Sequence, residues 1–381
     1  MNPRPDSRRR GLYIHAPFCD GKCFYCAFYS RPYESTLARR YLSALETELK
    51  QRPPLVVETV YFGGGTPTVF SSSELRELCR IVARNVSLTG LKEWTVEANP
   101  GSLTPGKLDV LAAAGVNRIS LGAQSFDDAA LKWLGRRHTA ADIYKAVRMV
   151  KSAGFDNFGM DIIACIPGFP PDTWRQTISA VVALGPKHIS VYALTVEEGA
   201  RLAAGAPSKK RAFRLLSEDE ELADLYLAEK ILADAGYEHY EISNYARPGF
   251  ECRHNVACWR GGEYIGIGPA AASHAGLKRW TNRADLGKYL ASLERGEKPP
   301  RSVDACGEKT RRIEKVVFGL RLSAGVSAET AAGCEKPLRA LRAQGLVACA
   351  NGCWRLTERG KYLADYVGIE IMTWADRPGG G

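Results

Sequence analysis

Hydrophobic and polar positions follow two different periods along the first half of the chain. Short runs rich in β-branched and aromatic residues are separated by amphipathic segments such as TLARRYLSALETEL and SSELRELCRIVARN, whose apolar residues recur at helical spacing. This strand–helix alternation predicts parallel strands joined by right-handed crossovers, in either a barrel or an open doubly wound sheet. The expected strands cover residues 12–18, 57–64, 93–100, 118–125, 158–168 and 188–195.

Six such strands favour an α/β core built as a partial (β/α)6 barrel of the TIM type over a complete eightfold barrel. Residues able to do chemistry gather where these strands end. Cysteines follow the first strand, GGGTP ends the second, and Glu97, Gln124 and Asp161 lie late in the third to fifth. Because the carboxyl ends of parallel strands meet at one edge of the sheet, we expect a functional site there.

The pattern changes after the sixth strand. A long helix with an acidic first turn, SEDEELADLYLAEKILADAG, precedes a stretch rich in glycine, aromatic and small residues. From Glu308 onwards we expect three helices and then a β-hairpin turning at Asn351-Gly352, an α+β unit that resembles a winged helix. The predicted divisions are a basic flexible tail (1–10), the core (11–245), a connecting region with an HNVACW motif (246–300) and a C-terminal domain (301–381).

Composition places the 381-residue chain among soluble globular proteins, with 45% hydrophobic and 25% charged residues. We find no apolar run near the roughly 18 residues of a transmembrane helix. The basic start MNPRPDSRRR leads into GLYIHAPFC, which is too short and too polar for the core of a signal peptide, so a cytoplasmic location is expected. The net charge of +10 permits an acidic partner, such as nucleic acid, anionic lipid or a carboxylate-bearing ligand, without choosing among them.

Three of the eleven cysteines share one short loop, CDGKCFYC, at Cys19, Cys23 and Cys26. An odd cysteine count in a chain without a signal peptide argues against a disulfide framework and for reduced, metal-binding thiols. Structural zinc normally takes four ligands in two separated pairs, and here only His15, inside the first strand, offers a fourth. A four-iron cluster on three thiolates instead leaves one iron open to an exogenous ligand.

The CxxxCxxC spacing after a first strand, with Tyr25 before the third cysteine, resembles the radical S-adenosylmethionine (SAM) superfamily. The resemblance implies a [4Fe–4S] cluster on the three cysteines and SAM chelated to its open iron. Reductive cleavage of SAM would then give a 5′-deoxyadenosyl radical. The amides of GGGTP are expected to bind the methionyl end of SAM, and Tyr25 to pack on its adenine. The candidate SAM-binding residues are Tyr13, Tyr25, Gly63, Gly64, Gly65, Thr66, Glu97, Gln124, Arg136 and Asp161.

Longer segments narrow the resemblance to the coproporphyrinogen-oxidase-like group, and within it to the HemW-type haem chaperones. These segments include YIHAPFCDGKCFYCAF, TVYFGGGTPT, RISLGAQSFDDAALKWLGRRH and WRGGEYIGIGPAAASH. The oxygen-independent coproporphyrinogen III oxidases of this group carry a further cysteine two residues after the triad, where this chain has Phe28. The resemblance therefore implies haem binding and haem transfer to acceptor proteins, with a HemN-type C-terminal domain, and decarboxylation of coproporphyrinogen III is not expected.

A haem-associated HNxxYW motif of these relatives reads HNVACW here. His254 is a candidate axial ligand and Cys258, in place of the tyrosine, a candidate thiolate ligand. The alternative is a satisfied structural histidine and a small buried cysteine. A second departure is DIIACIPG after the fifth strand, which puts Cys165 near the predicted mouth of the barrel.

The predicted partners are haem or a porphyrin-like ligand, a haem-acceptor protein, and a reductant such as a flavodoxin or ferredoxin. The positive charge also permits peripheral association with a membrane. Two enzymatic alternatives stay open: a radical SAM methyltransferase using two SAM molecules, and the decarboxylating oxidase, which Phe28 disfavours. A winged-helix regulator is the non-enzymatic alternative, but no nucleic-acid partner is expected, and no residue is assigned a catalytic role.

Replacing any one of Cys19, Cys23 and Cys26 with serine is expected to abolish the visible absorption of the reconstituted cluster, because each thiolate is predicted to bind a different iron. Cys349 and Cys353, a lone CxxxC pair in the C-terminal domain, supply the control. Serine at either of these positions is expected to leave the cluster absorption unchanged. A normal spectrum in any variant of the triad would contradict the assignment.

Overall fold

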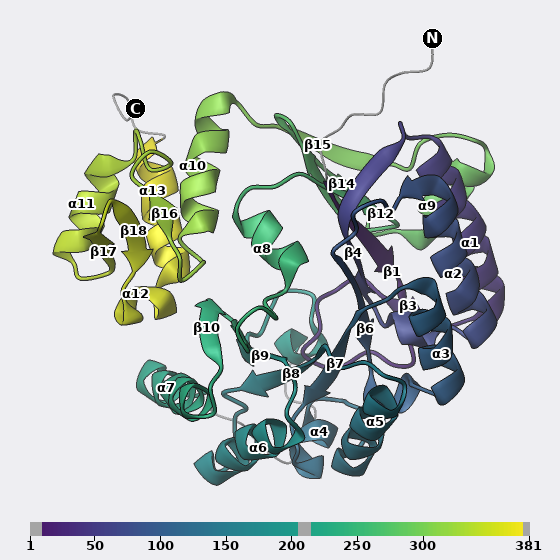
Figure 1. Ribbon diagram of the computed structural model, residues 1–381, viewed down its shortest axis with the longest axis horizontal. Helices are drawn as coiled ribbons and strands as arrows, with labels where there is room; N and C mark the ends of the chain where they lie inside the picture. The colour runs from purple at the N-terminus through teal and green to yellow at the C-terminus, as the bar shows by residue number, and fades with distance from the viewer. Residues whose placement is uncertain (1–9, 205–214, 376–381) are drawn as a thin grey trace.

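The computed structural model describes residues 10–204 and 215–375, so the predicted flexible tail, apart from Arg10, lies outside the described residues. Within them, a curved sheet carries helices on its outer face and confirms the predicted partial (β/α)6 barrel (Figure 1). The six parallel strands, each followed by at least one helix, are β1 (Arg10–Ala16), β4 (Leu55–Gly64), β6 (Glu93–Ala98), β7 (Arg118–Gln124), β8 (Phe158–Ala164) and β9 (His188–Ala193).

These strands lie in chain order, β1-β4-β6-β7-β8-β9, and every neighbouring pair is parallel. They are buried on both faces, as parallel strands covered by crossover helices must be, and all seven residues of β7 are buried. The helices and short strands of the core are α1 (Ser35–Lys50), α2 (Ser72–Asn85), α3 (Pro105–Ala114), α4 (Asp128–Trp133), α5 (Ala140–Ser152), α6 (Pro171–Leu184), η1 (Pro67–Val69), η2 (Pro100–Ser102), η3 (Arg201–Ala204), β2 (Phe18–Cys19), β3 (Arg31–Pro32) and β5 (Val86–Ser87).

Local capping signals explain where several of these helices begin and end. Ser71 and Glu74 form a capping box at the start of α2, as do Thr139 and Asp142 at the start of α5. Helix α6 ends at Gly185, whose φ of 66° lies in the left-handed region that glycine adopts without strain. These signals agree with the helical spacing of the apolar residues, so local sequence and fold point the same way.

The sheet continues past the six predicted strands at both edges. Strand β12 pairs in parallel with β1, and three antiparallel strands follow it, while two short antiparallel strands extend the β9 edge. Strand β12 was not predicted because a glycine interrupts its apolar pattern. The glycine is required there, since a side chain at Gly266 would stand 2.1 Å from the carbonyl oxygen of Ala272. The added elements are α7 (Glu218–Asp234), β10 (Glu238–Glu241), β11 (Asn244–Ala246), α8 (Arg253–Trp259), β12 (Tyr264–Ile267), β13 (Ala272–Ala275), β14 (Lys278–Asn282), α9 (Leu286–Glu294) and β15 (Arg301–Ala305).

The C-terminal unit has its own hydrophobic cluster around Val316, Leu338 and Ile371. The predicted hairpin turn is confirmed, with Asn351 at φ 51° and Gly352 at φ 70°. Of the three helices expected before it, the structure forms two, and the residues between them make hydrogen-bonded turns. The elements are α10 (Glu308–Gly319), β16 (Val326–Ser327), α11 (Glu335–Ala343), β17 (Val347–Ala350), β18 (Cys353–Leu356), α12 (Glu358–Tyr362) and α13 (Ala364–Ala375).

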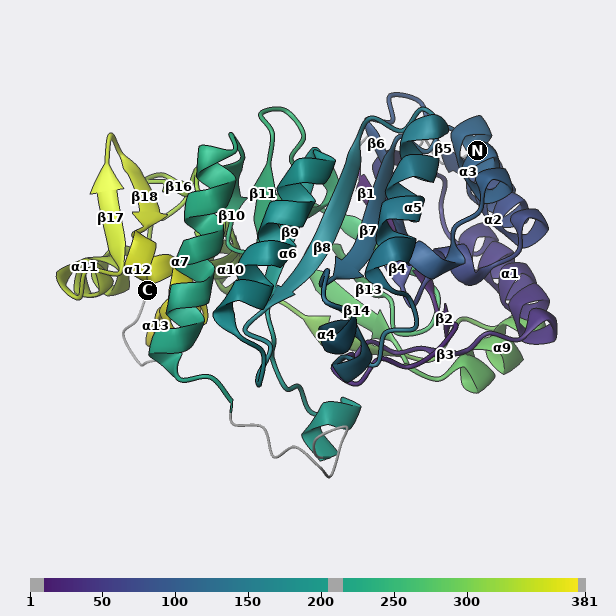
Figure 2. The same cartoon turned by 90° about the horizontal axis from the view of Figure 1, so that it is seen from below.

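The predicted domain boundaries stay predictions, but the sheet bears on the last of them. Strand β15 pairs with β14 as far as Ala305, so the large sheet extends five residues beyond the predicted start of the C-terminal domain. The two units meet beside α7, as Figure 2 shows. Glu229 of α7 accepts hydrogen bonds from the Lys361 Nζ at 2.9 Å and the Tyr362 hydroxyl at 3.0 Å. In the part of the chain that the structure describes, no helix is long and apolar enough to cross a membrane.

Glu48, on the buried face of α1, holds the added strands and α9 against the barrel. Its carboxylate accepts hydrogen bonds from Arg52, the Gly268 amide, the Asn282 amide group and the Tyr289 hydroxyl, all at 2.8–2.9 Å. The side chain is 1% exposed, so removing it strands four buried donors.

Glu48→Ala is therefore expected to lower the free energy of unfolding by about 3 kcal/mol or more, as when one partner of a buried ion pair is removed. Denaturant unfolding followed by circular dichroism measures the change. Glu46→Ala is the matched control, because Glu46, on the same helix, pairs with the exposed Lys50 and its loss should cost less than about 1 kcal/mol. Equal losses in the two variants would show that Glu48 does not hold the sheet extension.

Candidate functional site

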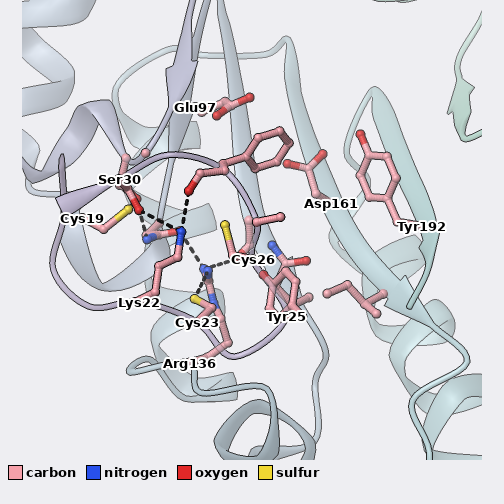
Figure 3. Close-up of a pocket in the computed structure, with 18 of the residues that line it drawn as sticks. Cys19, Lys22, Cys23, Tyr25, Cys26, Ser30, Glu97, Arg136, Asp161 and Tyr192 are labelled. Carbon is pink, nitrogen blue, oxygen red and sulfur yellow. Dashed lines mark hydrogen bonds between the residues drawn. The ribbon is translucent and has the colours of Figure 1, made fainter. Parts of the chain in front are cut away.

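A cavity of about 470 Å³ opens at the carboxyl ends of the parallel strands, where the sequence predicted a site (Figure 3). Two predicted SAM-binding residues, Tyr13 and Gly63, are not in its lining. The other predicted residues are brought together there, from segments up to 142 positions apart, Cys19 to Asp161. They are Cys19, Cys23, Tyr25, Cys26, Gly64, Gly65, Thr66, Glu97, Gln124, Arg136 and Asp161.

The three cysteines lie around one side of this cavity, Cys19 at the end of β2 and the other two in the loop that follows it. Two polar side chains contact their sulfurs: the Thr66 hydroxyl, just after β4, lies 3.6 Å from the Cys19 Sγ, and the Nη1 of Arg136, between α4 and α5, donates to the Cys23 Sγ at 3.4 Å. Lys22 donates to the backbone carbonyl of Phe28, which closes the loop on itself. The loop therefore presents its thiols to a common space beside two cations.

This arrangement suits a cluster better than a single metal ion. Among the described residues, no three His, Cys, Asp or Glu side chains converge closely enough to hold one ion, as a structural zinc site would require. His15, the candidate fourth zinc ligand, bonds through its Nε2 to the carbonyl of Tyr29 at 2.8 Å. Burial lowers the pKa of His15, so it is a neutral, hydrogen-bonded core residue. Three separated thiols facing one cavity fit the predicted [4Fe–4S] cluster.

The glycine loop after β4 is shaped by close packing against β1 and β2. A side chain at Gly65 would stand 2.5 Å from the Phe18 carbonyl oxygen, and one at Gly64 would stand 2.5 Å from the His15 ring. The amides of Gly65 and Thr66 donate to the carbonyls of Ala16 and Phe18, at 2.8 and 2.7 Å. These two amides therefore hold the segment that leads into the cysteine loop, while SAM binding by the rest of the glycine segment stays a prediction.

Two half-buried carboxylates form the wall opposite the cysteines (Figure 3). Glu97 accepts a hydrogen bond from the Tyr61 hydroxyl at 2.8 Å, and the Asp161 oxygens lie 3.3 Å from the Ser120 hydroxyl. Burial raises the pKa of Glu97 to about 7; the Tyr61 hydrogen bond opposes the shift and the charge of Asp161 adds to it. Burial also raises the pKa of Asp161. A carboxyl group in a cleft whose pKa lies near 7 can lose its proton and bind a cationic ligand.

Several lining residues were missed in the sequence. Asn99 links two predicted residues, since its side-chain nitrogen donates to Thr66 at 2.9 Å and its oxygen accepts from Arg136 at 2.6 Å. It stands two positions after Glu97, at the same strand end, which was the available signal. Tyr192, at the end of β9, is 44% exposed and forms part of the rim. Its strand was predicted, but no chemistry marked the residue.

Two predicted residues take positions that spacing did not indicate. Tyr13 lies in the interior of the barrel, its ring 6.1 Å from that of Tyr61, rather than at the cavity. Gln124 lines the cavity with a φ of 67°, which is strained for a residue other than glycine and follows a register shift between β7 and β8. The shift turns the end of β7, so that Gln124 no longer follows the alternation of the strand.

The HNVACW motif forms α8, which closes the opposite, amino-terminal end of the barrel. Glu93, the first residue of β6, accepts hydrogen bonds from the amides of Arg253 and His254 at 2.9 and 3.1 Å. The His254 Nδ1 lies 2.9 Å from the Thr59 hydroxyl, and its ring lies 5.3 Å from that of Tyr61. Burial lowers the pKa of His254 to about 4, so the imidazole is neutral. The structure does not bring His254 to the cysteine cavity.

Neither remaining cysteine candidate reaches the cavity. Cys258 lies on α8 and is not in the cavity lining, and burial raises its pKa to about 12, which keeps the thiol protonated. Cys165 is 4% exposed, and its Sγ lies 3.8 Å from the carbonyl oxygen of Glu221 on α7. It lines a separate cavity of about 570 Å³ between α6 and α7.

Comparison with known proteins agrees with the geometry. Residues 13–181 match the model of the radical SAM superfamily, which confirms the prediction of a [4Fe–4S] cluster and SAM. The chain is 36% identical over 330 residues to the heme chaperone HemW of Lactococcus lactis, covering 86% of this chain and 85% of that one. It is 34% identical over 366 residues to the heme chaperone HemW of Mycobacterium tuberculosis, covering 94% and 93%.

The fold also has a solved counterpart. The structure of coproporphyrinogen III oxidase (HemN) from Escherichia coli, a radical SAM enzyme, superposes with a TM-score of 0.83 at 23% identity, covering 96% of this chain and 91% of that one. At this level of identity the likeness concerns the fold, including the α+β C-terminal unit. It confirms the predicted architecture of a barrel followed by a HemN-type domain.

The pKa of Glu97 leads to a pH dependence of SAM binding. Only the ionised carboxylate attracts the ammonium and sulfonium groups of SAM, and the ionised fraction rises as the pH rises through about 7. Affinity for SAM is therefore expected to be about tenfold weaker at pH 6 than at pH 8, because one proton must leave on binding.

Calorimetric titration of the reconstituted protein with SAM across this range measures the change, together with the protons released. Glu97→Gln carries no charge at any pH, so this variant should bind SAM weakly and with a flat pH profile. A tenfold pH effect that persists in Glu97→Gln would assign the titration to another group.

Proposed function

The chain belongs to the HemW family of radical SAM proteins, and on that basis we propose that it binds haem and transfers it to an acceptor protein. Full-length similarity to proteins named heme chaperones supports the proposal. The cavity fits this proposal as well, because its three thiols can bind a cluster and its half-buried carboxylates can bind the cationic groups of SAM.

One residue carries the distinction from the decarboxylating oxidases. Phe28 stands where the resemblance places a further cysteine in those enzymes, and it is 69% exposed at the rim of the cavity. An exposed aromatic side chain contributes an apolar surface and no metal ligand. Together with Tyr192 across the rim, it offers a flat apolar ligand two rings on which to pack.

The residues around the cavity divide the remaining tasks. Cys19, Cys23 and Cys26 would hold the cluster, which when bound supplies an electron to SAM. Arg136 is fixed by Asn99 and the Gly122 carbonyl, so its guanidinium stays beside the Cys23 sulfur and balances negative charge there. Glu97, held by Tyr61, would receive the cationic groups of SAM.

Haem ligation by His254 or Cys258 stays a prediction, and the structure sets a condition on it. The His254 ring is 5% exposed and packed against Thr59 and Tyr61, so iron can reach it only if α8 moves away from the barrel. The thiol of Cys258 must lose its proton to bind iron, against the burial that raises its pKa. Of the two, the neutral imidazole needs no ionisation, which favours His254.

Anaerobic reconstitution with iron, sulfide and SAM, followed by haem titration and mixing with an apo-haemoprotein, tests the proposal. Stoichiometric haem uptake and its passage to the acceptor, read from the absorption of each partner, are expected. SAM products are analysed in parallel with dithionite present. S-adenosylhomocysteine with a methylated porphyrin would show a methyltransferase, and carbon dioxide released from coproporphyrinogen III would show the oxidase; either result would overturn the proposal.

Absorption titration with haem separates the two candidate ligands. His254→Ala is expected to shift the Soret band and to weaken haem binding by about tenfold or more, because the axial nitrogen is lost. Cys258→Ala, on the same helix, is expected to bind haem as the unchanged protein does. Thermal melts of both variants check that α8 still closes the barrel. Unchanged spectra and affinities in both folded variants would exclude ligation by either residue.

A further inference from the structure

A further cavity, of about 440 Å³, lies away from the cysteine site, between α1 and the antiparallel pair β14–β15. The end of α1, this strand pair and the loop that leads into β15 form its walls, and Figure 2 shows α9 beside α1 in this part of the molecule. Gln51 clamps the loop, since its side-chain nitrogen donates to the carbonyls of Gly296 and Glu297 at 3.0 and 3.2 Å. The cavity has the size of a small-molecule site.

The charged side chains that line this cavity are mainly cationic. Four cationic side chains line it, namely Arg52, Lys278, Lys298 and Arg301, and they come from three separate segments. Its one carboxylate, Glu48, is already saturated by four hydrogen bonds. Among the described residues, none forms an ion pair with Lys278, Lys298 or Arg301, so three positive charges are left without compensation.

Buried polar atoms in the same walls lack hydrogen-bond partners among the described residues. They are the Gln51 Oε1, the Arg52 Nε and the Trp280 Nε1. Leaving a buried donor or acceptor unpaired costs about 1–3 kcal/mol, so such atoms call for a bound group. Two of the three are donors, and both lie in a wall of positive charge, which is where an oxygen-rich anion would accept hydrogen bonds.

Alternation along β14 and β15 decides which of their side chains face the cavity. Trp280 pairs directly with Val303, and Lys278 and Arg301 lie two residues from them on the same face. The Arg52 and Arg301 guanidinium groups lie 5.9 and 5.4 Å from the centre of the Trp280 ring. The indole thus holds both guanidinium groups in place by cation–π contact, which orients them before a ligand arrives.

We propose that this cavity binds a phosphate group, carried by a small phosphorylated molecule or by the headgroup of an anionic phospholipid. Guanidinium groups present paired donors that match phosphate oxygens, and lysines add charge without a fixed direction. The exposed Val303, at 59% exposure, and the neighbouring Leu277, at 43%, give the rim the apolar character that a lipid surface would contact. The site does not depend on haem, SAM or the cluster.

Stabilisation of the α1 dipole does not account for the cluster. Cations near the carboxyl end of a helix are favourable, but of the four only Arg52 follows α1 directly in the chain. The other three lie on other elements: Lys278 on β14, Arg301 on β15 and Lys298 in the loop that leads into β15. Solvation of the exposed Lys278, Lys298 and Arg301 does not account for the cavity either, because the Arg52 Nε and the Trp280 Nε1 beside them are buried and lack partners among the described residues.

Calorimetric titration of the full chain with inorganic phosphate and pyrophosphate tests the free-anion source. Binding of pyrophosphate is expected in the unchanged protein and a loss of affinity of tenfold or more in Lys298→Glu/Arg301→Glu. Trp280→Phe removes one donor without altering charge and is expected to weaken binding about tenfold, as for a hydrogen bond to a charged group. Lys145→Glu/Arg148→Glu, which makes the same charge change on α5, is the control and should bind normally.

Co-sedimentation with vesicles tests the lipid source. Vesicles containing phosphatidylglycerol are compared with vesicles of phosphatidylcholine alone, using the same variants. Binding in either arm that is lost in Lys298→Glu/Arg301→Glu and kept in the α5 control supports the site, and the arm that responds identifies the carrier of the phosphate. Thermal melts confirm that each variant is folded.

Three results would overturn the proposal. The first is no binding of phosphate, pyrophosphate or anionic vesicles by the unchanged protein. The second is equal loss in the cavity variant and the α5 control, or unchanged affinity in Trp280→Phe, either of which would reduce the effect to overall charge. The third is citrate binding as tightly as pyrophosphate, which would show that any polyanion suffices.

Discussion

The close approach of the glycine loop to the start of the chain is the constraint on which the site depends. The amides of Gly65 and Thr66 reach the carbonyls of Ala16 and Phe18 at hydrogen-bond distance, and no side chain fits at Gly64 or Gly65. This backbone contact joins the end of β4 to the segment that leads into the cysteine loop. The three thiols are therefore placed over the strand ends by main-chain geometry, where Thr66 after β4 and Arg136 between α4 and α5 contact the sulfurs.

The interior of the barrel links its two ends through buried polar groups. Tyr61 donates to Glu97 at the cavity wall, and the same ring packs on His254 at the opposite end. Glu93 holds the first amides of α8, so the HNVACW helix serves as the floor of the barrel. A movement of α8 that exposed His254 would remove a neighbour of Tyr61, the residue that holds the carboxylate of Glu97. The predicted haem ligand on α8 and the carboxylate predicted to bind SAM thus both contact Tyr61.

Local patterns predicted much of the core because they agree with the fold. Buried parallel strands read as apolar runs, amphipathic helices cover them, and the cysteines, Glu97 and Asp161 stand at strand ends where such sheets gather chemistry. What failed was governed by contacts between distant segments. Strand β12 was hidden because Gly266 weakens a strand pattern yet is required where the Ala272 carbonyl approaches. Tyr13 was misplaced because its side-chain direction depends on the interior packing of the barrel, and the register shift that shapes the backbone at Gln124 was not predicted.

By itself, the sequence determined the fold class, the cysteine loop, most residues of the cavity and the family resemblance, because each rests on spacing along the chain. Only the tertiary structure decided which groups are free to act. It paired the amides of Gly65 and Thr66 with carbonyls of β1 and β2, made His15 a core residue, and placed His254 under the barrel. It also gathered Arg52, Lys278, Lys298 and Arg301 around one cavity, although they lie up to 249 positions apart, Arg52 to Arg301. Hydrogen-bond satisfaction and uncompensated charge are properties of groups in space, and spacing along the chain does not encode them.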